Sequence, residues 1–128
     1  MRLLLDSHLL IWATTDPDRL SASVQKMIDD PSNLVWFSTA TIWELAIKQQ
    51  TKRSNLTIDL AVMRETLLAN RYQELVVNAQ HALAIRTLPL LHRDPFDRLL
   101  LAQAIVEGAT LLTADKTLAG YPAPVYLI

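Results

Sequence analysis

Short apolar runs recur along this chain, separated by longer segments with helical patterning. The clearest run is Leu3-Leu4-Leu5, which ends at Asp6. A continuous apolar run is typical of a strand buried on both faces of a parallel sheet, although so few residues could also be helical. Strands that alternate with helices predict an α/β fold, here a three-layer α/β/α sandwich with a mostly parallel central sheet.

The expected elements follow from the apolar pattern and from capping residues. Strands are expected at residues 2–5, 34–37, 74–77, 110–112 and 125–127, and helices at residues 7–14, 21–30, 59–70, 78–87 and 95–107. A further helix, the third in order, carries Trp43, Leu45, Ala46 and Ile47, with capping hydroxyls from Ser38, Thr39 and Thr41. A polar stretch over residues 49–55 ends the third helix, and Gly108 is placed to stop the last one. Trp36 and Trp43 lie in apolar stretches, so we expect both in the core.

The composition indicates one globular domain covering residues 1–128. A hydrophobic fraction of 51% with only 2 Gly is too apolar for a disordered or linker-rich chain. The absence of Cys excludes disulfides, thiolate zinc sites and a cysteine nucleophile. The first apolar run is too short for a secretory signal, and no run has the length of a membrane span. We therefore expect a cytoplasmic protein without a membrane partner.

The formal net charge of −1 argues against a protein that holds nucleic acid by bulk positive charge. It does not exclude a nucleic-acid enzyme. A carboxylate site that holds divalent metal ions reverses its own local charge, and the net charge ignores those ions.

Acidic residues follow the predicted strands. Asp6 ends the first strand, Glu44 lies in the first turns of the helix after the second, Asp97 lies in the first turn of the long helix, and Asp115 follows the strand at residues 110–112. In open α/β sheets, binding sites form where strands end and the chain turns into helices. We therefore expect these acids to converge at one edge of the sheet.

Each acid also has a purely structural interpretation. Asp6 could cap the helix that follows it. Glu44 lies three residues after Thr41, the spacing of a capping box, and one turn before Lys48, with which it could pair.

The same holds for the acids near the C-terminal half of the chain. Asp94-Pro95-Phe96-Asp97 is a favourable helix start, with Asp94 as the cap and Asp97 favoured by the helix dipole. Asp115 could cap the short segment after it. The joint placement of the acids, rather than any one of them, indicates a site.

Clustered carboxylates repel one another unless metal ions or protons neutralise them. Oxygen ligands without Cys favour Mg²⁺ or Mn²⁺ over zinc. Such an ion could activate a water for in-line attack on a phosphodiester, so no histidine base is required. The three histidines, His8, His81 and His92, are too scattered to predict a zinc site.

Several neighbours of the acids could support the site. Ser7 and Thr113 could place hydroxyls near the metal, or serve only as caps. Arg93 and Arg98 could contact substrate phosphates, or form solvated ion pairs. His8 lies two residues from Asp6 and could belong to the site, to the surface or to the packing.

Four segments together resemble the PIN-domain family, and most closely the VapC-type toxins of bacterial toxin–antitoxin pairs. They are LLLD at residues 3–6, STATIWELAIK at residues 38–48, HRDPFDRLL at residues 92–100 and LTAD at residues 112–115. The resemblance covers nearly the whole chain, with the segments in the usual order and spacing. No departure in these segments suggests an inactive member.

The resemblance implies a Mg²⁺- or Mn²⁺-dependent endoribonuclease that hydrolyses RNA with a metal-activated water. Asp6, Glu44 and Asp97 would then be the core acids that hold metal, and Asp115 the fourth, more variable one. It also implies a homodimer and a cognate antitoxin that blocks the acidic site. Asp94 is interpreted as a helix cap.

Other α/β functions fit the sequence less well. A receiver domain would carry a pair of acids after the first strand, but Asp6 is followed by Ser7 and His8. A nucleotide-binding protein would need a Gly-rich phosphate loop, and Gly108 and Gly120 lie in no such context. The remaining alternative is a non-catalytic α/β interaction module that binds metal or phosphate.

Overall fold

The computed structural model describes residues 1–51 and 56–128 of the chain, and its strands form one sheet. The strands are β1 (Arg2–Leu5), β2 (Leu34–Ser38), β3 (Gln73–Leu75), β4 (Thr110–Thr113) and β5 (Val125–Leu127). They are ordered β3-β2-β1-β4-β5, and all four pairings are parallel. The predicted α/β fold class is confirmed.

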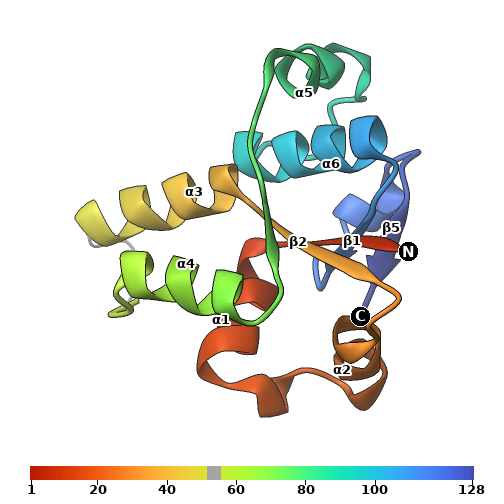
Figure 1. Ribbon diagram of the computed structural model, residues 1–128. Coiled ribbons are helices and arrows are strands. Elements are labelled where there is room, and N and C mark those ends of the chain that lie inside the picture. Colours follow the sequence, from red (N-terminus) through yellow and green to blue (C-terminus); the bar gives the residue numbers. More distant parts are fainter. Residues whose placement is uncertain (52–55) are drawn as a thin grey trace.

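Helices cover both faces of the sheet. They are α1 (Ser7–Thr15), α2 (Ala22–Asp29), α3 (Thr39–Gln50), α4 (Leu60–Ala69), α5 (Ala79–Ala84) and α6 (Pro95–Glu107), with 3₁₀ turns at Pro17–Arg19, Ile85–Thr87 and Leu118–Gly120. Figure 1 shows α1, α2 and α4 on one side of the sheet and α5 and α6 on the other. No helix in the described part of the chain combines the length and the apolar character needed to span a membrane.

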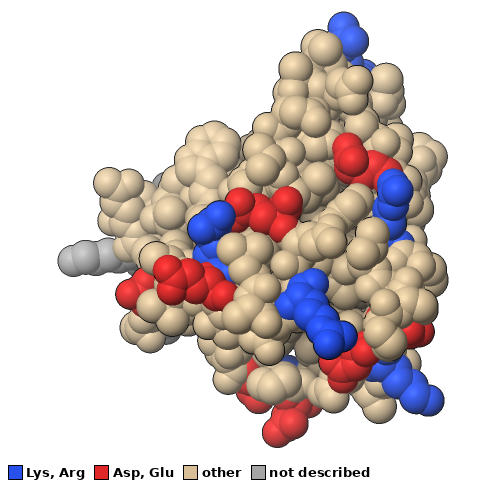
Figure 2. Space-filling model, viewed as in Figure 1, with Lys and Arg blue, Asp and Glu red and all other residues tan. Residues whose placement is uncertain are grey.

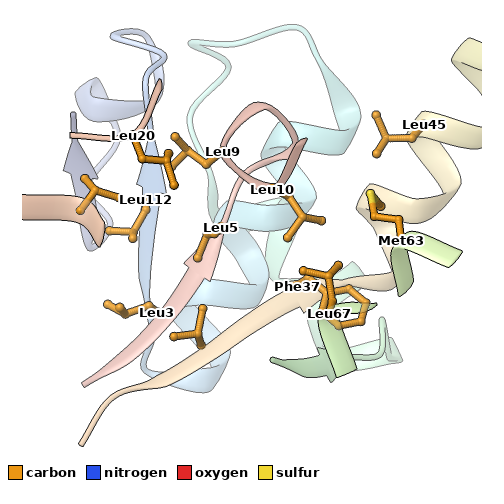
Figure 3. Close-up of a cluster of buried hydrophobic side chains, with 12 residues drawn as sticks. Leu3, Leu5, Leu9, Leu10, Leu20, Phe37, Leu45, Met63, Leu67 and Leu112 are labelled. Carbon is orange, nitrogen blue, oxygen red and sulfur yellow. The ribbon is translucent and has the colours of Figure 1, made fainter. Parts of the chain in front are cut away.

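Strand β1 contributes to both cores because its side chains alternate between the two faces of the sheet. Leu3 and Leu5 pack in the cluster that α1, α2 and α4 cover, part of which is drawn in Figure 3. Leu4 packs in the opposite cluster, against α6. All three leucines are fully buried, and each such burial stabilises the fold by about 1.5–3 kcal/mol. The strand is therefore held firmly up to its last residue, next to Asp6.

Three expectations about secondary structure and packing need correction. The helix predicted at residues 78–87 is α5 followed by the 3₁₀ turn at Ile85–Thr87. Strand β3 begins and ends earlier than predicted, and residues 52–55 of the predicted polar stretch lie outside the described residues. Trp43 is not in the core: it is 60% exposed.

Helical geometry explains the exposure of Trp43. The buried side chains of α3 are Ala40, Thr41, Glu44 and Leu45, a stripe that leaves Trp43 on another side of the helix. Its ring instead packs edge-on against Phe96, with ring centroids 5.0 Å apart. Trp36 lies partly buried in the core cluster of α6, as expected for it.

The sheet has a switch point between β1 and β4. The chain passes from β1 to β2 on one side, whereas β4 pairs with β1 on the other. The carboxyl ends of adjacent parallel strands leave a crevice at such a point. Here Asp6 follows β1 and Asp115 lies just beyond β4, so the fold brings two of the predicted acids to one place.

Candidate active site

Asp6 is both a helix cap and a link between two strands. Its Oδ1 accepts a hydrogen bond from the Leu9 amide at 3.0 Å, which caps α1 as predicted. Its Oδ2 accepts one from the Thr113 hydroxyl at 2.5 Å, which ties Asp6 to the end of β4. Burial raises the pKa of Asp6, the two hydrogen bonds oppose that shift, and the charge of Asp115 adds to it.

Glu44 points inward from α3 and is buried beside α1. The Ser7 hydroxyl donates to its Oε1 at 2.5 Å, and Lys48 forms an ion pair with its Oε2 at 3.0 Å. The predicted pairing with Lys48 is confirmed. The capping-box alternative is wrong, because Ser38 caps α3 and Thr41 lies inside the helix.

Asp97 lies in the first turn of α6, which Asp94 caps. The Asp94 Oδ1 accepts hydrogen bonds from the amides of Phe96 at 2.9 Å and Asp97 at 3.4 Å, so the interpretation of Asp94 as a cap is confirmed. Burial raises the pKa of Asp97 to about 7, and the charges of Asp94, Glu44 and Asp6 add to the shift. Asp97 thus lies within electrostatic range of two of the other predicted acids.

Asp115 is held on both sides. Its Oδ1 accepts a hydrogen bond from the Thr117 amide at 2.9 Å, and its own amide donates to the Thr113 hydroxyl at 3.0 Å. Its Oδ2 lies 2.8 Å from Nε2 of His92. Partial burial works to raise the pKa of Asp115, but the hydrogen bonds from His92 and Thr117 outweigh it and lower that pKa.

Asp6, Asp97 and Asp115 line one hollow at the carboxyl ends of β1 and β4. It has a volume of about 260 Å³, and its lining residues are Asp6, His8, Trp12, Asp97, Ala114 and Asp115. His8 is exposed and its ring centroid is 6.3 Å from that of Trp12. A larger cavity of about 490 Å³ lies at the start of β2 and β3 and contains none of the predicted acids. Chemistry rather than size therefore locates the candidate site.

Histidine 92 is the residue that sequence reasoning missed. Side-chain ligand atoms of His92, Asp97 and Asp115 lie within 4.8 Å of one another. The scatter of the three histidines along the chain argues only against a site built from histidines, and not against one histidine beside two acids. The position of His92 two residues before the Asp94 cap was the available signal, since that cap orients the start of the helix.

The two supporting hydroxyls contact the predicted acids, as their positions after β1 and at the end of β4 allow. Ser7 donates to Glu44 and Thr113 donates to Asp6. Arg98 donates to the Leu88 carbonyl at 3.4 Å, and Arg93 is exposed. Neither arginine forms an ion pair within residues 1–51 and 56–128. Contact of either with a substrate phosphate stays a prediction.

The donor set fits a hard divalent cation. Carboxylate oxygens are the ligands that Mg²⁺ and Mn²⁺ prefer. Burial, together with the charges of neighbouring acids, raises the pKa of Asp97, so a cation beside it would favour its ionised form. On the face shown in Figure 2, Lys and Arg side chains are scattered among acidic ones rather than gathered into one basic surface.

A PIN domain family model matches residues 3–123. The chain belongs to the PIN-domain family. The predicted family is thus confirmed, and all the segments that carried the prediction lie within the matched residues.

Individual relatives agree with this PIN-domain assignment. Ribonuclease VapC22 of Mycobacterium tuberculosis is 30% identical over 121 residues, which are 94% of this chain and 92% of that protein. The structure of VapBC2 from Rickettsia felis bound to a promoter DNA fragment superposes with a TM-score of 0.73 at 18% identity, covering 100% and 99% of the two chains. DNA-bound VapBC from Salmonella typhimurium gives a TM-score of 0.71 at 17% identity, covering 98% and 97%. The two structures share the fold of this PIN domain.

The pKa of Asp97 predicts how the metal-free PIN domain responds to pH. Folded Asp97 keeps its proton up to about pH 7, whereas the unfolded chain loses it near the ordinary value of 3.8. The free energy of unfolding should therefore fall as pH rises through that window. Asp97→Asn should remove this loss and stabilise the protein at pH 8 by about 2–4 kcal/mol, with no such gain at pH 4.

Urea denaturation at both pH values measures the effect. Asp18→Asn, at an exposed position on the first 3₁₀ turn, is the control and should show no pH-dependent gain. An Asp97→Asn difference that is the same at pH 4 and pH 8 would contradict the assigned electrostatics.

Proposed function

We propose that this PIN domain is a divalent-metal-dependent endoribonuclease and the toxin of a toxin–antitoxin pair. The observation that carries the proposal is the convergence of Asp6, Asp97 and Asp115 on one hollow at the β1–β4 switch point. A full-length relative that carries the name ribonuclease supports the reaction, and the likeness to VapBC structures supports an antitoxin partner.

Within this proposal, Asp6, Glu44, Asp97 and Asp115 hold Mg²⁺ or Mn²⁺. The bound ion supplies Lewis acidity at the scissile phosphate and makes a water more acidic. Asp97 is the first ligand that we assign, because burial and the charges of neighbouring acids oppose its ionisation and a bound cation would favour it. Ser7 and Thr113 orient Glu44 and Asp6 through the hydrogen bonds that they donate.

The proposed partners are RNA, an antitoxin and a second copy of the chain. Exposed apolar side chains on α3, on α5 and on the segments that flank α5 support a protein interface there; they are Trp43, Val76, Leu83, Leu90 and Leu91. A one-chain mass by sedimentation at micromolar concentration would contradict the homodimer.

Asp6→Asn is the most specific test of metal-dependent cleavage. Asn caps helices as well as Asp does, so the hydrogen bond from Leu9 can persist while the charge is lost. RNA cleavage in Mg²⁺ or Mn²⁺ should fall by at least about 100-fold, as expected when one electrostatic group of an active site is removed. Chelation of the metal should abolish cleavage by the wild-type protein.

Asp59→Asn is the matched control. Asp59 caps α4 through the Ala61 and Val62 amides and lies outside the hollow, so this variant should cleave normally. Cleavage that survives both chelation and Asp6→Asn would contradict the proposal. A folded wild-type protein that cuts no RNA in either metal would favour the non-catalytic interaction module.

Expression in growing cells tests the toxin role separately. The wild-type chain should arrest growth, and co-expression of the neighbouring small reading frame should relieve the arrest. The Asp6→Asn variant should not arrest growth, because the arrest is attributed to cleavage. Normal growth with abundant folded wild-type protein would contradict the toxin role and leave the nuclease proposal standing.

A further inference from the structure

The backbone at His92 is fixed by a buried tyrosine that lies 29 residues further along the chain. The Tyr121 hydroxyl oxygen accepts hydrogen bonds from the amides of Leu91 at 3.2 Å and His92 at 2.7 Å. Tyr121 itself is buried in the core cluster of α6, directly after the last 3₁₀ turn. The segment that leads into α6 is therefore anchored on a core residue, and the His92 ring starts from a defined position.

The hydrogen bonds of the ring define its tautomer. Nδ1 of His92 lies 3.0 Å from the Asp94 amide, which can only donate, so Nδ1 is the acceptor. In the neutral ring, the single proton then resides on Nε2. That N–H donates to Oδ2 of Asp115 at 2.8 Å, and Nε2 also lies 3.4 Å from Oδ2 of Asp97.

We infer that His92 is a positioning residue, which holds the carboxylate of Asp115 through its Nε2–H, close to the carboxylate of Asp97, and does not itself bind the metal. The inference rests on the proposed function and deepens it. It assigns to His92 the link between the acid of α6 and the acid after β4.

A chain of contacts extends this link to the first strand. Asp115 donates its amide to the Thr113 hydroxyl, and that hydroxyl donates to Asp6. Tyr121, His92, Asp115, Thr113 and Asp6 thus form one connected series from the core of the α6 side to the end of β1. Fixing the ring of His92 fixes the relative placement of acids from three different elements.

The rival role for His92 is that of a metal ligand, and the Asp94 amide opposes it. A ligating Nε2 needs a free lone pair, which would move the proton to Nδ1. Nδ1–H would then face the Asp94 N–H. Because both groups are donors, the hydrogen bond between them would be lost. The amide of the α6 cap therefore keeps His92 a donor toward the acids.

Two variants separate the two ends of the ring. The side chain of Gln is long enough to place an amide N–H near the position of Nε2 in His92→Gln. The shorter side chain of Asn in His92→Asn can place an acceptor near the position of Nδ1 but does not reach that of Nε2. The dissociation constant for Mn²⁺, measured calorimetrically on the purified protein, should rise about tenfold or more in His92→Asn and stay within about threefold of wild type in His92→Gln.

Each other outcome overturns the inference. If His92→Asn binds Mn²⁺ as tightly as the wild type does, the Nε2–H is not needed for metal binding, and the ring serves only to anchor the segment that leads into α6. If both variants fold and both bind weakly, the ring itself is required, as a metal ligand would be. Tyr121→Phe should weaken Mn²⁺ binding as well, because the Leu91 and His92 amides lose their acceptor.

Long-range ¹H–¹⁵N NMR of the wild-type protein gives an answer even if a variant fails to fold. At a pH where the ring is neutral, His92 should show a protonated Nε2, both without metal and with Mg²⁺. A protonated Nδ1 in either state would overturn the inference. Neither measurement involves RNA, so a wild-type protein that binds Mn²⁺ but cleaves no RNA would contradict the proposed function alone.

Discussion

Mutual repulsion among carboxylates at one end of a parallel sheet is the constraint around which this PIN domain is arranged. Neighbouring groups offset most of it. Lys48 pairs with Glu44, the Leu9 amide and Thr113 donate to Asp6, and His92 donates to Asp115. Among the described residues, the carboxylate of Asp97 has only the longer contact with His92, and burial together with neighbouring acids raises its pKa to about 7. A cation bound beside Asp97 would therefore favour its ionised form.

Structural and functional roles coexist on the same carboxylates. Asp6 has two oxygens: one caps α1, and the other connects to β4. Asp115 likewise uses one oxygen for the Thr117 amide and the other for His92. A capping interpretation therefore does not exclude a place in the site, since capping consumes only part of the hydrogen-bonding capacity of the group. Asp94, by contrast, serves as the cap of α6.

The sequence was sufficient to predict the sheet and the meeting of Asp6, Asp97 and Asp115 at one hollow, whereas Glu44 does not line that hollow. Leu3-Leu4-Leu5 could be placed because a strand buried on both faces must be apolar throughout, and Asp6 and Asp115 follow the carboxyl ends of their strands. The partner of Glu44 was also predictable, because helix spacing places Lys48 one turn on.

The remaining features depend on contacts that sequence spacing does not encode. His92 reaches Asp115 across a separation of 23 residues, and Tyr121 reaches His92 across 29. The prediction that Trp43 lies in the core is wrong because residues in an apolar stretch of a helix need not all lie on its buried face. The capping-box alternative for Glu44 is wrong because Ser38, one of the residues expected to cap this helix, is its cap, and Thr41 lies inside the helix.

The most direct test of the account is a crystal structure of the PIN domain grown with Mn²⁺, with the ion located by its anomalous scattering. The account predicts an ion in the hollow between β1 and α6, with an Asp97 oxygen among its ligands and a second carboxylate oxygen from Asp6, Glu44 or Asp115. An empty hollow at a saturating Mn²⁺ concentration, or an ion bound elsewhere with Asp97 free, would contradict it.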